Sequence, residues 1–255
     1  RLREYARDHY LEDVLLDYLL NNVVGYDLNP LAVLTARTNY LLMIADLPRR
    51  GTIEIPIYLT DSLMIERRST ITGNTYVLRT VVGEFQVPTT VVDRGLLPSI
   101  LSEVTDALRN RYTPTDFGNR LRYRFKDLDE NDLNILTNLY AQLLRLEQEG
   151  KDEVWVSIIR NAFAPILKGK FDYVVGNPPW VNWENLPESY REITKDLWAH
   201  YGLAKIRGKV GLGKVKRDLA MLFLVRAFDL YLKPGGRHGF LLPFTVFKTQ
   251  AGAGF

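Results

Sequence analysis

The sequence lacks several features that would assign a protein to a particular class. It contains no cysteine, so disulfide bridges and thiolate metal sites are excluded. Its three histidines, His9, His200 and His238, lie far apart, which argues against a histidine metal site. No apolar run approaches the roughly 20 residues of a membrane span, and no signal peptide is recognisable. We therefore expect a soluble, cytoplasmic protein without a bound metal.

A large excess of one charge is also lacking. The net charge is only +3 over 255 residues, of which 25% are charged. The chain as a whole is therefore not a polycation, and any affinity for nucleic acid must come from a local patch. The hydrophobic content of 46% is sufficient for a sizeable core, either in one large domain or in one domain with an insertion.

What the sequence does contain is one distinctive stretch, residues 171–180 (FDYVVGNPPW). Its apolar first half has strong β-preference and ends at Gly176, which predicts a short strand. Asn177 and two prolines follow, and the backbone there is rigid because proline fixes its own φ and has no N–H. In open α/β sheets ligands bind at the carboxyl ends of strands, so this stretch predicts a binding site.

The residue types in this stretch suit a planar aromatic amine. Such an amine can donate one hydrogen bond to the Asn177 side-chain oxygen and one to the Pro178 carbonyl, which leaves electron density on its nitrogen free for an electrophile. Trp180 can stack on the base that carries the amine, an interaction worth roughly 1–3 kcal/mol. The alternative is a plain Pro-Pro turn after a buried strand, with Trp180 in the core.

The stretch resembles the catalytic motif of S-adenosylmethionine-dependent amino-methyltransferases, especially the adenine-N6 DNA methyltransferases of restriction-modification systems. Their motif runs Asn/Asp-Pro-Pro followed by Tyr, Phe or Trp. The resemblance implies that Asn177, Pro178, Pro179 and Trp180 are catalytic and that the substrate is adenine in DNA. Similar enzymes methylate RNA bases or a protein glutamine amide, and a non-catalytic nucleic-acid-binding subunit could keep the same fold. These alternatives stay open.

A strand, a terminal acid and a helix precede this motif in the chain. Residues 23–26 form a short apolar run that ends at Asp27, and Asn29 is placed to cap a helix whose first residue is Pro30. An acid in this position commonly accepts hydrogen bonds from ribose hydroxyls, although a turn or capping role is equally compatible. The segment is similar to the second motif of the same family, which implies that Asp27 binds the cofactor ribose and that Leu28 lies beside its adenine.

The next expected strand spans residues 53–59, where apolar and polar residues alternate. Pro56 within it indicates an edge strand, because proline cannot donate to a sheet. Asp61 and Ser62 follow this strand. The resemblance to the family's third motif implies that Asp61 accepts a hydrogen bond from the cofactor adenine, with Ser62 also at the cofactor. From the residues alone, a turn role for Asp61 would be preferred.

Residues 65–165 interrupt the alternation of strands and helices. A connection of this length must carry structure of its own. Residues 74–93 are rich in β-branched side chains around Gly83 and predict a hairpin, and leucines at helical spacing follow from Leu97 onwards. We expect a mostly helical insertion that serves as a scaffold, between the two parts of a methyltransferase core at residues 1–64 and 166–255.

Residues 191–217 are strongly basic, with eight Lys or Arg and two Asp or Glu. Aromatic residues are interleaved with them, as in loops that face nucleic acid, although a solvated charged surface would look the same. The cations expected to contact DNA are Lys205, Arg207, Lys214 and Lys216. Residues 208–215 (GKVGLGKV) nearly match a phosphate-binding P-loop, but Val215 replaces the hydroxyl that holds Mg²⁺, so nucleotide hydrolysis is rejected.

The C-terminal part is expected to form a helix over residues 218–233, a Pro-Gly-Gly turn and a strand from His238 to Leu242. It resembles the next two motifs of the family, which implies that Asp218 or Phe223 lies near the cofactor or the target, while simple helix packing would explain Phe223 equally well. The alternation of strands and helices predicts a doubly wound, mostly parallel α/β sheet. The resemblance implies that this sheet is Rossmann-like and of the class I methyltransferase type.

The Gly-rich turn that holds the methionine part of S-adenosylmethionine in this family is not found in the sequence. A helix is expected over residues 3–20, and it resembles the helix that follows that turn. We therefore expect the turn upstream of Arg1, and a target-recognition domain, a specificity subunit or a restriction subunit outside this segment.

Overall fold

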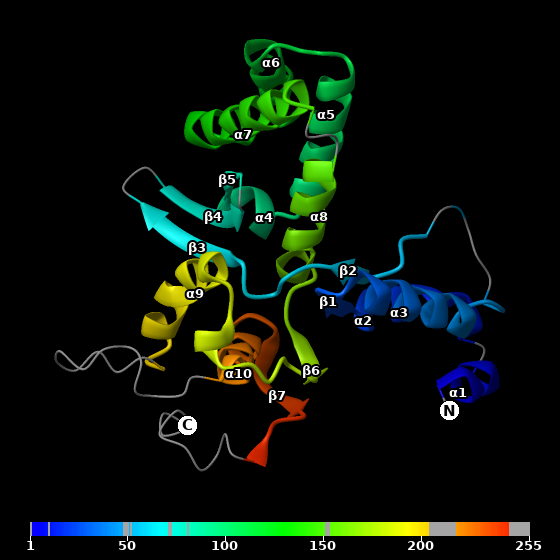
Figure 1. The fold of residues 1–255 in the computed structure, drawn as a ribbon. Helices are drawn as coiled ribbons and strands as arrows, with labels where there is room; N and C mark the ends of the chain where they lie inside the picture. The colour runs from blue at the N-terminus through cyan, green and yellow to red at the C-terminus, as the bar shows by residue number, and fades with distance from the viewer. Residues whose placement is uncertain are drawn as a thin grey trace. The chain divides into compact units, whose positions relative to one another are not determined.

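The computed structural model describes residues 2–9, 11–47, 51, 53–70, 73–80, 82–150, 154–203 and 218–244. The chain divides into two compact units, and each is assembled from segments that are not contiguous in sequence (Figure 1). Unit 1 contains residues 1–62 and 90–168, and unit 2 contains residues 63–89 and 169–255. Both units combine helices with short strands, so the protein is of mixed α/β class.

The N-terminal part of unit 1 contains a small parallel sheet. Its elements are α1 (Leu2–Asp8), α2 (Glu12–Asn22), β1 (Gly25–Asp27), α3 (Pro30–Met43) and β2 (Ile57–Leu59). Strands β1 and β2 pair in parallel, with Asp27 opposite Leu59. Gly25 permits this close pairing, because a Cβ there would lie only 2.8 Å from Cδ1 of Ile57. The strand expected over residues 53–59 is shorter than predicted: β2 begins directly after Pro56, because proline cannot donate to the sheet.

The helix expected over residues 3–20 is in fact two helices, α1 and α2. Leu11 precedes α2 without a side-chain cap. Leu15, Leu16 and Leu19 are buried, whereas Val14 and Tyr18, which belong to the same apolar repeat in the sequence, are each 55% exposed. The buried side faces α3, where the Tyr40 hydroxyl donates to the Leu19 carbonyl at 2.7 Å. Tertiary packing therefore decides which face of α2 is buried.

Helix α3 begins as the sequence predicts. The Asn29 side chain accepts from the Leu31 and Ala32 N–H groups, and Pro30 occupies the first helical position. The buried face of the helix carries Val33, Tyr40 and Ile44. The leucines that indicated this helix in the sequence are largely exposed instead, among them Leu31 at 72% and Leu34 at 62%.

The rest of unit 1 is helical. It consists of α4 (Thr89–Asp93), α5 (Leu97–Arg109), α6 (Pro114–Arg124), α7 (Glu130–Gln148) and α8 (Val154–Leu167). The helices predicted from leucine spacing are confirmed as α5, α7 and α8. Helix α6 was not predicted; Thr113 and Asp116 form a capping box at its start. Buried Glu103 of α5 accepts hydrogen bonds from Arg120 and Arg124 of α6 and so ties these two helices together.

Unit 2 begins with an antiparallel sheet of β3 (Ile65–Thr70), β4 (Gly73–Thr80) and β5 (Gly83–Pro88), in the order β3-β4-β5. The predicted hairpin is confirmed as β4 and β5, with Thr80 opposite Gly83. Gly83 has a φ of +134°, which favours glycine at this turn. Strand β3 was not predicted, since its sequence IERRST is polar and charged.

The second part of unit 2 contains the Asn-Pro-Pro-Trp motif and the elements around it. Its elements are β6 (Phe171–Gly176), the 3₁₀ helix η1 (Trp183–Asn185), α9 (Glu188–His200), α10 (Leu219–Leu230) and β7 (Leu232–Phe240). Strands β6 and β7 are parallel, and Gly176 lies opposite Phe240. The strand expected from His238 to Leu242 begins earlier, at Leu232, so the Pro-Gly-Gly segment expected as a turn lies inside β7. The register shifts there, between Phe171 and Tyr173, and Gly235 has a φ of +79°.

Unit 2 has its own hydrophobic cluster. Its buried members are Leu63, Trp183, Leu197, Trp198, Leu219 and Leu222. Buried Arg226 of α10 donates to the Ile65 carbonyl and to the Tyr201 hydroxyl, which links α10 to β3 and to the end of α9. Trp183 and Trp198 are two of the aromatic residues that lie within or just before the basic stretch and were expected to face nucleic acid. That expectation is wrong for these two, because their rings are buried in this core.

The described strands form three separate sheets, two of them parallel pairs. The α/β class is confirmed, whereas a continuous doubly wound sheet is not seen among the described residues. In the described part of the chain no helix is long and apolar enough to cross a membrane. Within the same residues no group of three or more His, Asp or Glu side chains is placed to hold a metal ion.

Candidate active site

The Asn-Pro-Pro-Trp motif leaves strand β6 at its carboxyl end, as the sequence predicts. Gly176 is the last residue of the strand, and its carbonyl accepts from the Leu241 N–H at 3.1 Å. A Cβ on Gly176 would lie 3.1 Å from Cε1 of Phe240, closer than ordinary van der Waals separation. Glycine at this position therefore lets the start of the motif lie close against β7.

The four residues of the motif differ in their surroundings. Asn177 is exposed, and among the described residues none hydrogen-bonds its amide. Pro178 is buried, while Pro179 is exposed. The Trp180 ring is 56% exposed, and its Nε1–H donates to the Leu241 carbonyl at 3.1 Å. The alternative of a tryptophan buried in the core is thus not what the structure shows.

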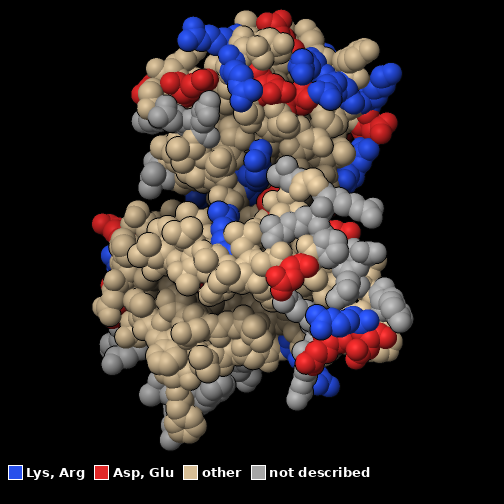
Figure 2. Space-filling view, turned by 90° about the vertical axis from the view of Figure 1, so that its right-hand side faces the viewer, with Lys and Arg blue, Asp and Glu red and all other residues tan. Residues whose placement is uncertain are grey.

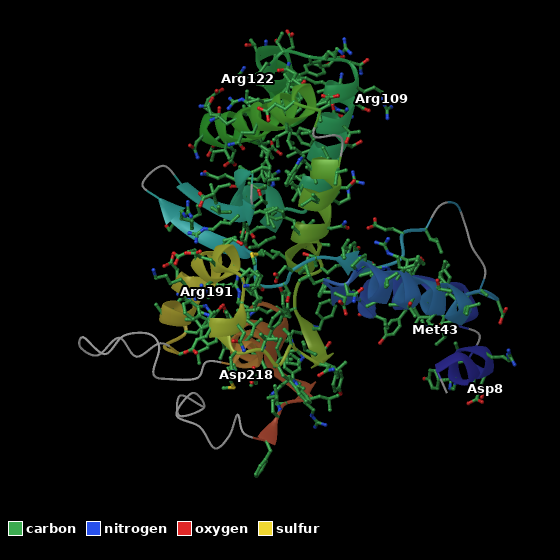
Figure 3. All side chains as sticks on the ribbon, viewed as in Figure 1. Asp8, Met43, Arg109, Arg122, Arg191 and Asp218 are labelled. Atoms are coloured by element: carbon green, nitrogen blue, oxygen red, sulfur yellow. The ribbon has the colours of Figure 1, made fainter. Side chains whose placement is uncertain are left out.

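The chain that follows the motif is held by the start of α10. The Val181 carbonyl accepts from the Leu219 N–H at 2.9 Å, and Asn182 forms an isolated antiparallel bridge with Asp218. Asp218 is also the N-cap of α10, where its carboxylate accepts from the Ala220 N–H at 3.0 Å (Figure 3). The motif is therefore fixed before its first residue, at its tryptophan ring and after its last residue, while its amide stays available.

The predicted ribose-binding acid lies at the carboxyl end of the other parallel pair. The Asp27 carbonyl accepts from the Thr60 N–H at 3.0 Å, which joins the ends of β1 and β2. Its carboxylate Oδ1 accepts from the Asn29 N–H at 2.7 Å, so the turn role considered for this residue is observed. Asp27 is exposed, and its Oδ2 has no hydrogen-bond partner among the described residues.

The donor and acceptor groups at this end of β1 and β2 fit a nucleoside. Thr60 Oγ1 is buried and, within the described residues, has no hydrogen-bond partner. Leu28 is 64% exposed and offers an apolar surface next to Asp27. Asp61 and Ser62 are half-buried directly after β2. The exposed carboxylate of Asp27 and the exposed side chain of Leu28 are groups that can contact the hydroxyls and the flat base of a nucleoside.

Phe223 is placed on α10, in unit 2. It is half-buried and packs against the hydrophobic cluster that contains Trp183 and Trp198. The guanidinium of Arg191 lies over the Trp183 ring, 5.5 Å from its centroid, on the same cluster (Figure 3). This packing accounts for Phe223 without a ligand, and its role at the cofactor stays a prediction.

The four cations expected to contact DNA, Lys205, Arg207, Lys214 and Lys216, lie outside the described residues. The described beginning of the basic stretch is helix α9, where Lys195 pairs with Glu192 at 3.7 Å and Asp196 pairs with Arg79 at 3.6 Å. Figure 2 shows Lys and Arg interspersed with Asp and Glu on the face it presents. On that face the described residues therefore do not form a continuous positively charged patch.

One position that shapes the motif was not predicted from the sequence. Leu241 acts through its backbone N–H and carbonyl, so its residue type carries no signal. Asp218, which the family resemblance places near the cofactor or the target, combines the N-cap of α10 with the bridge to Asn182 next to the motif. Its contact with a ligand stays a prediction.

Comparison with known proteins gives a consistent result. The model of the Eco57I restriction-modification methylase family matches residues 21–255. Two curated relatives from Haemophilus influenzae, the type II methyltransferases M.HincII and M.HindII, are each 28% identical over 118 residues, which cover 45% of this chain. The matched segment spans only about a fifth of their length, 21% and 20% respectively. No solved structure matches.

Proposed function

The chain belongs to the Eco57I restriction-modification methylase family, and from this premise we propose that it transfers a methyl group from S-adenosylmethionine to the N6 amine of adenine in DNA. The observation that carries this proposal is the Asn-Pro-Pro-Trp motif at the carboxyl end of β6. Its amide is exposed and has no partner among the described residues, and its backbone is held on both sides. We also propose that the protein acts together with a restriction partner, either a separate subunit or a further domain.

On the target side, each residue of the motif has a distinct task. Asn177 Oδ1 and the Pro178 carbonyl accept the two hydrogens of the amine, which directs its nitrogen lone pair towards an electrophile. Pro178 and Pro179 keep these acceptors in fixed directions, so little reorganisation is needed when the amine arrives. Trp180 stacks on the adenine ring. Extruding a base from the duplex costs a few kcal/mol, which stacking and the two hydrogen bonds offset.

On the cofactor side, the ends of β1 and β2 supply the binding groups. Asp27 Oδ2 accepts from the ribose hydroxyls, Leu28 and Ser62 line the nucleoside, and Asp61 accepts from the adenine amine. Phe223 is assigned to the same ligand by resemblance to the family. S-adenosylmethionine supplies an electrophilic methyl group when bound.

The proposed architecture is a class I methyltransferase core with a Rossmann-like doubly wound sheet and with residues 65–165 as an insertion. Two observations support it. Both pairs are parallel, and β1 and β2 are connected through a helix, as in doubly wound sheets. Tyr173 and Val175 of β6 are 70% and 83% exposed, although strands of parallel sheets are normally buried on both faces.

The experiment that tests this function is a methyl-transfer assay on the full-length protein. Duplex DNA, RNA and a glutamine-containing protein are offered with S-adenosylmethionine labelled in its methyl group. We expect label in DNA alone, and N6-methyladenine after digestion to nucleosides. Label in RNA or protein would replace the DNA assignment, and no transfer to any acceptor would contradict the enzymatic function.

The DNA partner can be tested separately through the basic stretch. If it follows a DNA backbone, replacing Lys205, Arg207, Lys214 and Lys216 by Gln should flatten the slope of log K against log salt by roughly 2 to 4 units, about 0.9 for each phosphate that is no longer neutralised. Base discrimination should stay the same, because cations bound to phosphates do not read sequence. An unchanged slope would identify the stretch as an ordinary solvated surface.

A further inference from the structure

The segment after β7 contacts the motif twice, and both contacts come from one residue. The Leu241 N–H donates to the Gly176 carbonyl, and the Leu241 carbonyl accepts from Trp180 Nε1, each at 3.1 Å. Gly176 directly precedes Asn177, and Trp180 is the last residue of the motif. The two peptide groups of a single residue therefore span the whole motif and connect its beginning to its end.

This arrangement fixes an exposed aromatic ring. Trp180 is 56% exposed, and an exposed side chain without a partner has several rotamers available, so ordering it costs free energy at the moment a ligand binds. The hydrogen bond from Nε1 selects one ring orientation in the free protein. More than half of the ring surface nevertheless stays open to a stacking partner.

The hydrogen bond to Leu241 requires tryptophan. The motif type admits Tyr, Phe or Trp at this position, and only the indole carries an N–H on the edge of its five-membered ring. Phenylalanine has no donor, and tyrosine places its hydroxyl at the far end of the ring. In this chain the backbone after β7 can therefore hold the aromatic residue through a hydrogen bond. A motif with Phe or Tyr at this position cannot form that hydrogen bond.

We propose that Leu241 is a positioning residue for methyl transfer: its carbonyl holds the Trp180 indole as a preformed stacking platform for the extruded base, and its N–H holds the strand end from which Asn177 projects. This inference rests on the proposed function, because a platform acts on transfer only if a base is bound. A hydrogen bond that only stabilised the fold would leave the Michaelis constant for DNA unchanged.

The test replaces Trp180 in the full-length protein by β-(3-benzothienyl)alanine, which has the shape of tryptophan but a sulfur in place of the N–H. We expect KM for target DNA to rise about 2- to 12-fold, the worth of one hydrogen bond. Because stacking is then weakened equally in the ground and transition states, kcat should stay within about twofold. Cofactor affinity should not change. An unaltered KM would overturn the proposal.

Two further variants calibrate this result. The same replacement at Trp198, whose buried indole N–H has no partner among the described residues, should leave KM at the wild-type value. Trp180→Ala, which removes the ring itself, should raise KM by roughly 5- to 150-fold, the range for one base stack. If the Trp198 variant raised KM as much as the Trp180 variant, the effect would be structural and the proposal would fail.

A measurement that needs no activity separates this inference from the function on which it rests. In the full-length protein with ¹⁵N-labelled indoles, the Trp180 resonance is identified by its loss in Trp180→Phe, and its exchange with water is compared with that of free N-acetyltryptophanamide. We expect exchange slowed severalfold. Unprotected exchange would overturn the positioning role alone, whereas protection without transfer to DNA would overturn the proposed function and leave only a structural hydrogen bond.

Discussion

The two parallel strand pairs of the molecule both end in a polar residue proposed to bind a ligand, but they hold that residue in different ways. At the end of β1, Asp27 uses one carboxylate oxygen for the Asn29 N–H, so the same side chain builds the turn and offers a binding group. At the end of β6, Asn177 takes no structural hydrogen bond within the described residues, because Leu241 and Leu219 hold the backbone around it.

This difference matters for the effects of substitutions. Where one side chain has both roles, a substitution changes folding and binding together, and the two effects must be separated by choosing the replacement. Where neighbouring residues carry the structural role, the polar side chain can be removed while the loop stays in place. The following predictions test this distinction, in order of decreasing effect.

The largest effect is expected for Asn177→Ala. It should lower kcat about a hundredfold or more, a loss typical of removing one preorganised polar group at a reacting centre. The free energy of unfolding and the affinity for S-adenosylmethionine should not change, because the amide contacts neither the described fold nor the cofactor in the proposed arrangement. Transfer rates and calorimetry measure both. Asn134→Ala on the exposed face of α7 is the control, and activity within a few-fold of wild type would contradict the role of Asn177.

At the other sheet end, Asp27→Ala and Asp27→Asn should behave differently. Alanine removes the acceptor for the Asn29 N–H and the ribose ligand, so it should weaken cofactor binding by about 1.5–3 kcal/mol and destabilise the fold by about 1 kcal/mol. Asparagine keeps one oxygen for the Asn29 N–H, so stability should be preserved while affinity falls. Calorimetry and urea unfolding measure these effects. Unchanged affinity in the folded asparagine variant would leave Asp27 with the turn role only.

A smaller effect is expected for Gly176→Ala at the start of the motif. The new Cβ would lie 3.1 Å from Cε1 of Phe240, so the ring must move, and the free energy of unfolding should fall by about 1 kcal/mol. Gly239→Ala is the matched control on β7, because its Cβ would lie at an ordinary 3.8 Å from Val175 Cγ1. Combining Gly176→Ala with Phe240→Leu should recover the loss. If Gly176→Ala and Gly239→Ala lowered the free energy of unfolding equally, the close approach to Phe240 would not be the cause of the loss.

The smallest effect concerns the packing of α3 against α2, in Tyr40→Phe. At neutral pH the loss should be about 0.5 kcal/mol, because the Leu19 carbonyl keeps its bond from the Val23 N–H. Burial raises the pKa of Tyr40 from 10.0 to about 12. The folded state therefore favours the protonated phenol, and this stabilisation is present below pH 10 and lost as the pH rises towards 12. The phenylalanine variant should lose less stability over that interval in alkaline unfolding, and an identical pH profile would contradict this.

The local elements were largely predictable from the sequence because they depend on local chemistry. Asn29 and Pro30 identify the start of α3, Gly83 marks the hairpin, and the apolar run before Gly176 identifies β6. Each of these signals acts over a few residues through caps, φ angles or hydrogen-bonding capacity. The position of Asn177 after β6 was predictable for the same reason.

The features that were not predicted depend on long-range packing. The apolar repeat of α2 does not show that Leu16 is buried while Val14 and Tyr18 are exposed, because this depends on packing against α3. Trp183 and Trp198 lie among charged residues in the sequence, yet residues far along the chain enclose them. The second bond of Leu241, to Trp180, joins backbone to side chain across 61 positions, and no residue type predicts it.

The interleaved segments of the two units constrain how the chain can fold during its synthesis. Unit 1 cannot be complete until residue 168 has left the ribosome, although its first 62 residues emerge early. The antiparallel sheet β3-β4-β5 can form as soon as it is made, since its pairings are local. Its link to α10 joins Ile65 to Arg226, which lies 161 positions later in the chain. While the chain ends between residues 90 and 168 this link cannot form, and nascent chains arrested there should recruit chaperones more strongly than released ones.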